Sequence, residues 1–159
     1  MLRVALFEPE IAGNVGNIAR TCVASGAELH LIRPYGFRLT DEAVRRSGMD
    51  YWANVALTQH ASFAAFQAVF AETFAAGRVF AFTTKAASSY SDVTYRDGDV
   101  LLFGPESRGL PEPVRELCTQ VKIPMQPSAR SLNLAVSVGV GVFEAWRQLG
   151  SAGLAARSL

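Results

Sequence analysis

The sequence predicts an α/β domain built on a mostly parallel β-sheet with helices on both faces. Short β-rich runs alternate with helical patterns along the chain, as in folds where helices connect parallel strands. Two of the runs, RVFAFTT and DVLLFG, are apolar at odd and even positions alike, which is typical of strands covered on both faces. Half of the 159 residues are hydrophobic, so the chain can bury a core. We expect one domain over residues 1–159, in which a tail from about residue 151 need not be ordered.

The first half of the chain carries strand and helix signals in turn. RVALFE (residues 3–8) is a β-rich run, and apolar residues at helical spacing then begin at Asn14 and stop at Gly26. ELHLI (28–32) is the second predicted strand, and the turn RPYGF ends it. A short helix is expected from Thr40 to Gly48, followed by a strand at NVALT (54–58).

The second half continues the alternation. Ser62 is placed to cap a helix that Gly77 ends. RVFAFTT (78–84), DVLLFG (99–104) and QVKIPM (120–125) are the remaining predicted strands, with a few helical residues after Pro111. In a parallel sheet, ligands bind beyond the carboxyl ends of the strands. These ends are the loops EPEIAGN, FGPESRGLP and IPMQPSARS, where we expect the functional site.

Residues 131–149 can be read as a strand or as a helix, because valine alternates with serine and glycine in the middle. The segment is too long for an ordinary strand and ends in helix formers before Gly150, so we predict a helix. Gly139 and Gly141 are unfavourable inside a helix and indicate close approach of another backbone, which could be that of a partner helix. The stripe expected to face the sheet is Leu132, Ala135, Val136, Gly139, Val142, Phe143 and Trp146.

Composition and charge exclude several classes of protein. Fifteen basic and fourteen acidic residues give a net charge of +1, so a nucleic acid would have to be recognised locally. No apolar run approaches the ~20 residues of a membrane span, and MLRVALFEPE is unlike a signal peptide, so we expect a cytoplasmic protein. Cys22 and Cys118 are expected to be reduced. With His30 and His60 they show no metal-ligand spacing, so no metal is expected.

The glycine loops match no nucleotide motif that is specific by itself. GNVGN is not followed by the acid of a dinucleotide fold, no GK[ST] is present, and Ser107 is not in a GxSxG turn. In FGPESRGLP, Gly104 and Gly109 would let the backbone approach a flat ligand while Glu106 and Arg108 fix the loop. An ordinary tight turn with a surface ion pair explains the same residues equally well.

Three segments together resemble the motifs of the SpoU branch of the SPOUT class of RNA methyltransferases: NVGNIAR, LLFGPESRGLP and IPMQPSARSLNLAVSVGVGVFEAWRQ. EPEIAGNVGNIAR, LHLIRPYGF and GMDYW further resemble a small bacterial family that methylates the wobble ribose of leucine tRNAs. The resemblance implies a C-terminal trefoil knot, a homodimer and bound S-adenosylmethionine. It implies methyl transfer to the ribose 2′-hydroxyl of cytidine or uridine in a tRNA anticodon stem-loop.

The resemblance also implies roles for individual residues. The catalytic set is Arg20, Asn14, Glu106 and Asn133. The cofactor set is Phe82, Thr83, Gly104, Ile123, Met125, Ser131 and Leu132. For substrate RNA we expect Arg130, Arg108, Arg45, Arg46 and Lys85, of which the last three are chosen because they fall in loops near the proposed site. Arg33 and Arg38 are further candidate RNA contacts, and Tyr35, Tyr51 and Trp52 offer stacking faces.

Some positions depart from the family pattern, and other functions stay open. Phe143 stands where a tyrosine is expected, and Ala12 and Gly13 replace a proline-rich pair. Because a guanidinium keeps its proton in proteins, Arg20 is expected to act as a charge rather than as a base. The alternatives are a methyltransferase for another tRNA position or for ribosomal RNA, a non-catalytic RNA-binding knot protein, and an unrelated nucleotide-binding protein.

Overall fold

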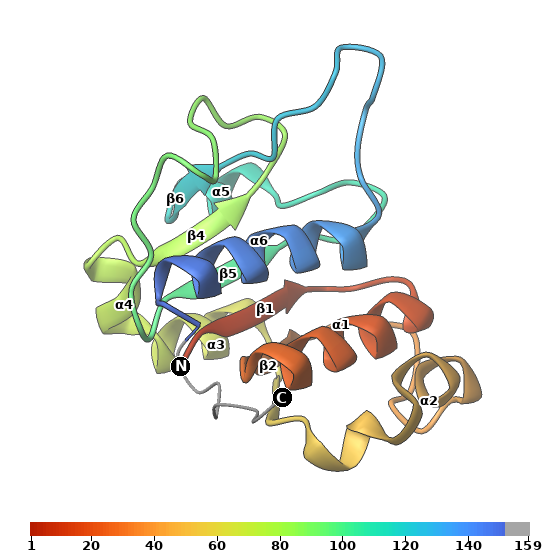
Figure 1. Cartoon of the computed structure of the whole chain (residues 1–159). Helices are drawn as coiled ribbons and strands as arrows, with labels where there is room; N and C mark the ends of the chain where they lie inside the picture. Colours follow the sequence, from red (N-terminus) through yellow and green to blue (C-terminus); the bar gives the residue numbers. More distant parts are fainter. Residues whose placement is uncertain (152–159) are drawn as a thin grey trace, which may run out of the picture.

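The computed structural model describes residues 1–151, and the side chains of all of these except residues 48–50. A six-stranded sheet forms the centre of the molecule, and helices cover both of its faces (Figure 1). The strands are β1 Arg3–Phe7, β2 Glu28–Ile32, β3 Leu57–His60, β4 Val79–Phe82, β5 Val100–Phe103 and β6 Thr119–Val121. The helices are α1 Ala12–Ser25, α2 Glu42–Gly48, α3 Phe63–Val69, α4 Ala71–Ala75, α5 Glu112–Arg115 and α6 Leu134–Gln148, with a 3-10 turn η1 at Met49–Asn54.

Every pair of neighbouring strands is parallel, in the order β3-β2-β1-β5-β4-β6. The predicted fold class, a parallel sheet with helices on both faces, is therefore confirmed. The register sets Leu6 of β1 beside Phe103 of β5, and Phe103 beside Phe82 of β4. Because the strands are parallel and their last residues are in register, the loops that follow them leave from the same edge of the sheet.

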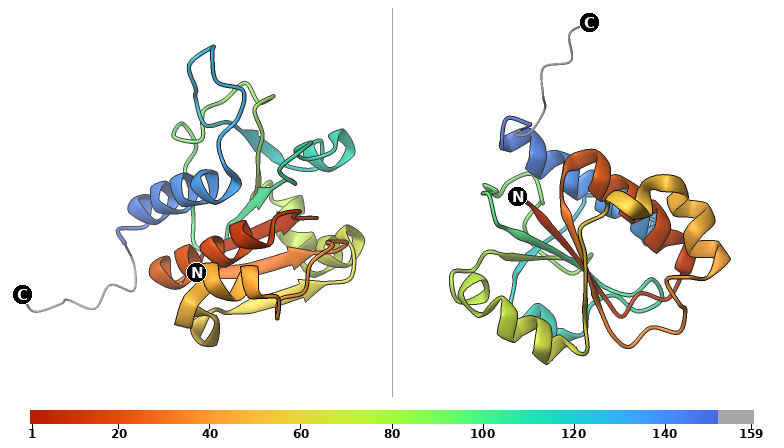
Figure 2. Two further views of the ribbon diagram at one scale, coloured as in Figure 1. Left: turned by 90° about the vertical axis from the view of Figure 1, so that its right-hand side faces the viewer. Right: turned by 90° about the horizontal axis from the view of Figure 1, so that it is seen from below.

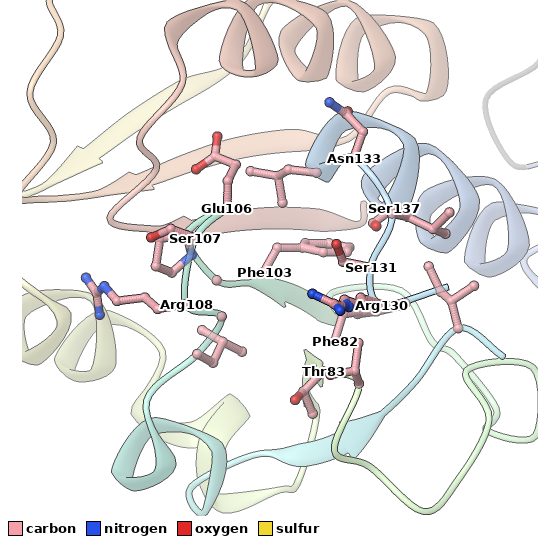
Figure 3. A pocket seen from close by; sticks show the side chains of 18 of the residues that line it. Phe82, Thr83, Phe103, Glu106, Ser107, Arg108, Arg130, Ser131, Asn133 and Ser137 are labelled. Atoms are coloured by element: carbon pink, nitrogen blue, oxygen red, sulfur yellow. The ribbon is translucent and has the colours of Figure 1, made fainter. Parts of the chain in front are cut away.

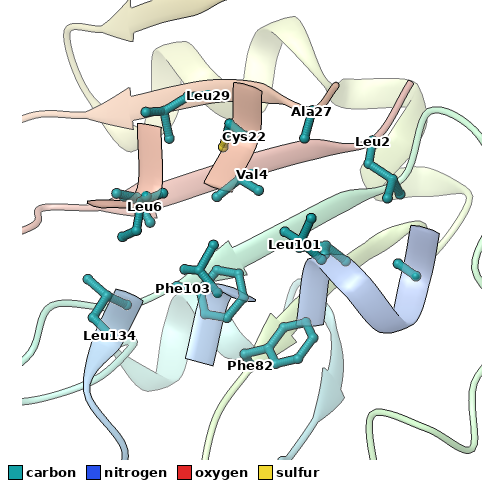
Figure 4. Packing of buried hydrophobic residues seen from close by; sticks show 14 of the residues in the cluster. Leu2, Val4, Leu6, Cys22, Ala27, Leu29, Phe82, Leu101, Phe103 and Leu134 are labelled. Atoms are coloured by element: carbon teal, nitrogen blue, oxygen red, sulfur yellow. The ribbon is translucent and has the colours of Figure 1, made fainter. Parts of the chain in front are cut away.

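The strand side chains divide the core into two layers. On one face lie Val4, Leu29 and Leu101 (Figure 4). They belong to the same buried cluster as Ile18 of α1 and Val138 of α6. The alternate strand residues point the other way and pack against α3 and α5. This second layer contains Ala5, Ala81, Leu102, Phe66 and Val114. Figure 2, seen from below, shows α1 and α6 on one side of the sheet and α3 and α5 on the other.

Several predicted boundaries were wrong, each for a local reason. The first helix begins at Ala12 rather than Asn14. The third strand is Leu57–His60 rather than residues 54–58, because the 3-10 turn occupies the chain as far as Asn54. The helix capped by Ser62 divides at Phe70 into α3 and α4. The tail expected from about residue 151 lies outside the described residues.

The prediction for the last helix was correct in type and wrong in the face that it buries. The helix begins at Leu134, not at residue 131, because the side chain of Asn133 caps it. Its buried residues are Leu134, Val138, Gly141, Val142 and Ala145. Of the stripe predicted to face the sheet, Val142 is buried and Ala135 and Trp146 pack partly against the core, while Leu132, Val136 and Phe143 are 40%, 52% and 46% exposed. An almost wholly apolar helix has two candidate faces, and its sequence alone does not choose between them.

The two helical glycines have different surroundings. A Cβ on Gly141 would lie 2.7 Å from the Phe82 ring, so this glycine admits a side chain from the sheet rather than another backbone. A Cβ on Gly139 would meet nothing within 4 Å. Within the described chain, a side chain rather than a backbone packs on Gly141, and the approach of a partner helix to Gly139 stays a prediction.

Candidate functional site at the carboxyl edge of the sheet

A cavity of about 490 Å³ opens at the carboxyl edge of the sheet, beyond β4, β5 and β6 (Figure 3). Each of the three loops expected to hold the site contributes to its wall. All seven predicted cofactor residues line it: Phe82, Thr83, Gly104, Ile123, Met125, Ser131 and Leu132. Asn14, Glu106 and Asn133 of the catalytic set also line it, as do Arg108, Arg130 and Lys85 of the RNA set.

Two aromatic rings make an apolar wall for this cavity. Phe82 and Phe103 end neighbouring strands in register, and their rings stack with centroids 4.5 Å apart and planes at 22°. Both rings are buried in the layer under α6. Since Thr83 and Gly104 come next, the chain passes directly from this aromatic pair into the polar loops.

Gly104 is required by the loop itself. A Cβ at this position would lie 2.3 Å from the backbone nitrogen of Leu110 and 2.5 Å from the carbonyl carbon of Gly109. The loop therefore folds back on its own start. Gly109 completes the turn with a φ of 67°, a left-handed value that favours glycine. The two glycines thus fix the shape of the loop. This agrees with the interpretation of FGPESRGLP as an ordinary tight turn.

Glu106 fastens the second motif loop to the first. Its Oε2 accepts a hydrogen bond from the backbone N–H of Glu10 at 2.8 Å. Its Oε1 accepts from the backbone N–H of Ile11 and from the side-chain amide of Asn14, both at 3.1 Å. Three donors around one carboxylate are strong, directional interactions. Glu106 therefore holds the start of α1 against the loop after β5.

Asn133 fastens the third motif to the same network. Its Nδ2 donates to Oδ1 of the buried Asn14 at 3.1 Å. Its own Oδ1 accepts from the backbone N–H groups of Ala135 and Val136, at 2.8 and 3.3 Å. The asparagine before this apolar helix is thus both its N-cap and its link to α1.

A second set of contacts, which the sequence analysis missed, runs in the opposite direction between the first two loops. The Glu10 carboxylate accepts from Oγ of Ser107 at 2.7 Å and from its backbone N–H at 3.2 Å. The Glu8 carboxylate forms an ion pair with the guanidinium of Arg108. The sequence did contain a signal for these contacts, namely the two acidic residues of EPE directly after the first predicted strand. Each loop therefore offers a carboxylate to the other.

Three predicted residues lie away from the cavity. Arg20 is exposed on α1, and its guanidinium carbon lies 5.2 Å from the centroid of the Tyr51 ring. Asn14 and Arg20 were predicted to lie on different sides of their helix, as the structure shows. Arg45 and Arg46 are exposed on α2, where Arg46 lies 3.7 Å from Glu42.

The cysteines and histidines lie outside this site. Burial raises the pKa of Cys22 and of Cys118 to about 12, and both are free thiols, in agreement with the prediction that they are reduced. His30 and His60 are buried together, with Nδ1 and Nε2 at 3.1 Å. Among the described side chains, those of residues 1–47 and 51–151, no three histidine, cysteine or acidic groups gather as metal ligands. No helix in this range is both long and apolar enough to cross a bilayer.

Taken together, a parallel sheet and a cavity between three loops at its carboxyl edge define an α/β protein that binds a ligand at the ends of its strands. Residues 1–143 match the model of the SpoU rRNA methylase family, and the chain belongs to that family. The resemblance inferred from the three motifs is confirmed. The trefoil knot that it implies fits the family and stays a prediction.

Two relatives within this family are similar to the chain over almost its whole length. The chain is 46% identical over 160 residues to a tRNA (cytidine(34)-2'-O)-methyltransferase of Escherichia coli K12, covering 99% of both chains. It is 48% identical to the Photorhabdus asymbiotica protein of the same name, covering 96% of this chain and 97% of the other.

Solved structures agree with this comparison. One from a study of 2-OH methylation of C/U34 on tRNA has a TM-score of 0.90 and 51% identity, covering 94% of this chain and 97% of that one. Another, the SpoU methyltransferase AviRb of Streptomyces viridochromogenes in complex with the cofactor AdoMet, has a TM-score of 0.85 and 28% identity. That match covers 95% of this chain and 58% of AviRb.

Proposed function

We propose that this protein transfers a methyl group from S-adenosylmethionine to the ribose 2′-hydroxyl of the wobble nucleotide, cytidine or uridine, in tRNA, with leucine tRNAs as the substrates. One observation carries the proposal: the three SpoU motifs meet at one cavity, where side chains of all three are joined by hydrogen bonds. The names of relatives at 46% and 48% identity support the nucleotide and the reaction. Such a protein works in the cytoplasm, where its tRNA is found.

The cavity residues suit an adenosine-bearing cofactor. Its volume of about 490 Å³ falls in the range of small-molecule sites, roughly 300 to 1,000 Å³. Phe82 and Phe103 give an apolar wall for a flat ring, and Thr83 and Ser131 bring hydroxyls to the rim. Phe82, Thr83, Gly104, Ile123, Met125, Ser131 and Leu132 would hold the cofactor. When bound, S-adenosylmethionine supplies an electrophilic methyl group on a sulfonium.

The motif residues would contribute position and charge. Asn14, Glu106 and Asn133 hold the loops in one geometry, so the ribose hydroxyl meets a fixed site and loses little freedom in the reaction. Arg20 would stabilise the oxyanion that develops on the ribose O2′ and orient the adjacent phosphate. Arg20 does not line the cavity of its own chain. For Arg20 to act on the ribose, the bound RNA or a second subunit must therefore bring the reacting ribose and the Arg20 guanidinium together.

Basic residues around the cavity would grip the RNA backbone. Lys85 and Arg130 are exposed and line the cavity, so their charges face an incoming phosphate. Arg45 and Arg46 on α2 would extend this contact beyond the cavity. Arg108 is paired with Glu8, which reduces the charge that it offers to RNA.

A homodimer would cover the apolar outer face of α6. Val136 and Phe143 lie seven positions apart, so they share one exposed face of α6, and the exposed Leu132 lies just before the helix begins. Large apolar side chains gathered on one exposed face mark an interaction site. Phe143 packs its ring edge-on against Trp146, at a centroid distance of 5.7 Å. Without a hydroxyl, Phe143 contributes packing alone to such an interface.

Incubation with labelled S-adenosylmethionine and total tRNA, followed by mapping of the modified nucleotide, tests the function. We expect label on the 2′-hydroxyl of the wobble nucleotide of leucine tRNAs. Label at another tRNA position, or on ribosomal RNA only, would contradict the substrate. RNA binding without transfer would indicate a non-catalytic protein, and lack of affinity for S-adenosylmethionine would contradict the cofactor.

A further inference from the structure

The segment after β2 forms a layered stack of one cation and two aromatic rings. The guanidinium carbon of Arg33 lies 4.9 Å from the centroid of the Tyr35 ring. The Tyr35 ring stacks in turn on Phe37, with centroids 4.9 Å apart and planes at 22°. Both rings are half-buried against the core, whereas Arg33 is exposed. The stack therefore ends in a guanidinium that faces solvent.

A residue of the neighbouring strand holds this stack in place. Oε1 of Gln59, in β3, accepts a hydrogen bond from Nη2 of Arg33 at 3.0 Å and from the hydroxyl of Tyr35 at 2.5 Å. Burial raises the pKa of Tyr35, so its hydroxyl stays protonated and can donate. A cation held in one orientation loses less conformational entropy when it binds than a free one does.

The charge of the stack is not neutralised by a neighbour. Among the side chains of residues 1–47 and 51–151, no carboxylate forms an ion pair with Arg33 or with the exposed Arg38. The guanidinium of Arg33 donates instead to the neutral amide oxygen of Gln59. The face of the Tyr35 ring attracts the Arg33 cation and so stabilises it without cancelling its charge.

The stack shares an edge of the sheet with the cavity. It follows the carboxyl end of β2, which pairs in parallel with β1, and β1 pairs with β5, whose loop lines the cavity. Two strand spacings of about 4.8 Å separate β2 from β5, roughly 10 Å in all. An RNA loop with one nucleotide in the cavity can therefore reach the stack with another.

We propose that Arg33, Tyr35, Phe37 and Gln59 form a platform for an unpaired base of the substrate RNA close to the methylated nucleotide. The base stacks on the exposed plane of the Arg33 guanidinium, and the charge of Arg33 and Arg38 attracts the flanking phosphates. This proposal rests on the proposed function, since it takes the substrate to be a tRNA anticodon loop. The platform contributes affinity and position, and does not touch the reacting atoms.

Fluorescence of a synthetic anticodon stem-loop that carries 2-aminopurine beside the wobble position tests the platform, because stacking quenches this base. We expect the full-length protein to quench it. Arg33→Ala should remove the quenching and raise the Kd by about 5- to 150-fold, the range for loss of one stacked base. Arg33→Lys, which keeps the charge without the plane, should retain the salt dependence of the Kd and lose the quenching.

Arg96→Ala is the matched control, because Arg96 is exposed near the start of β5, at the opposite edge of the sheet, and its loss changes the net charge equally. It should leave quenching and Kd unchanged. In turnover, Arg33→Ala should raise the KM for tRNA and leave kcat and the affinity for S-adenosylmethionine as in the wild type. Equal Kd values for Arg33→Ala, Arg96→Ala and the wild type would overturn the platform. Lack of methylation by a wild type that binds and quenches the stem-loop would overturn the proposed function instead.

Discussion

The side-chain amide of Asn133 donates a hydrogen bond to Oδ1 of Asn14, joining residues 119 positions apart across 3.1 Å. Asn14 donates in turn to Glu106, so one line of hydrogen bonds connects all three motif loops. Side chains linked in this way act as a unit, and losses on removing two of them should not add.

Asn133→Asp separates the two roles of Asn133. Aspartate keeps an oxygen for the N–H groups of Ala135 and Val136, so the helix cap and the melting temperature should be retained. It presents no donor to Asn14, and we expect kcat/KM to fall about tenfold, the equivalent of one lost hydrogen bond. Thermal melting and initial rates measure the two effects.

Asn133→Ala is the control, because it loses the cap and the donor together. We expect it to lower stability by about 1 kcal/mol in addition to the loss of activity. Wild-type activity in Asn133→Asp would show that the link between the motif loops does not matter for turnover.

Arg20→Ala should remove transfer and leave the cofactor site intact. Loss of one group that stabilises a developing oxyanion lowers kcat by about 100- to 1,000-fold. Because Arg20 lies outside the cavity, the affinity for S-adenosylmethionine should not change. Calorimetric titration and single-turnover rates provide the measurements, and Arg96→Ala controls for loss of an exposed positive charge. Normal turnover in Arg20→Ala would take Arg20 out of the mechanism.

Gly141→Ala should destabilise the protein and weaken cofactor binding. The new methyl group would lie 2.7 Å from the Phe82 ring, which is already stacked on Phe103 and cannot easily move. Overpacking of this kind costs about 1 to 3 kcal/mol. Chemical denaturation and titration with S-adenosylmethionine measure both effects.

Gly139→Ala, on the same helix, is the matched control for Gly141→Ala. Nothing lies within 4 Å of the Cβ that it adds, so the fold should not lose stability when both variants are compared in the same oligomeric state. Equal melting temperatures for the two variants would mean that the Phe82 ring moves aside at no cost.

The buried histidine pair predicts a loss of stability in mild acid. Burial lowers the pKa of both His30 and His60 below the usual 6.5. The unfolded chain therefore takes up protons near pH 6.5 while the folded protein does not. The stabilisation is complete above pH 6.5 and is lost as the pH falls below it.

His60→Gln removes one titrating ring and keeps a hydrogen-bonding side chain beside His30. Between pH 7.5 and 5.5, its melting temperature should fall less steeply than that of the wild type. Glu28, whose carboxylate lies 3.5 Å from Nε2 of His30, opposes the shift and remains in both proteins. Parallel pH profiles would exclude the histidine pair as the source of the acid sensitivity.

A charge on the outer face of α6 should dissociate the proposed dimer. Val136→Glu places a carboxylate on the face of α6 that carries Val136 and Phe143, where burial against a second copy is costly. Val69→Glu is the control, since Val69 is 67% exposed at the end of α3, on the other face of the sheet. Light scattering should give a monomer for Val136→Glu alone. A dimer that survives this change would place the interface elsewhere.

The sequence by itself determined the fold class and the family. Two local signals were sufficient for the fold class: strands with apolar residues at odd and even positions alike, and Gly26 as the end of a helix. In the structure these strands are buried and Gly26 caps α1. The three motifs likewise identified the loops that line the cavity, because the carboxyl ends of parallel strands must share an edge.

Only the tertiary structure decided which face of α6 is buried, that Arg20 lies outside the cavity, and that Glu8 and Glu10 hold the loop after β5. Each of these depends on contacts between residues far apart in the chain. Periodicity describes a helix face but not its partner, and a carboxylate after a strand gives no indication of which distant N–H or guanidinium it will meet.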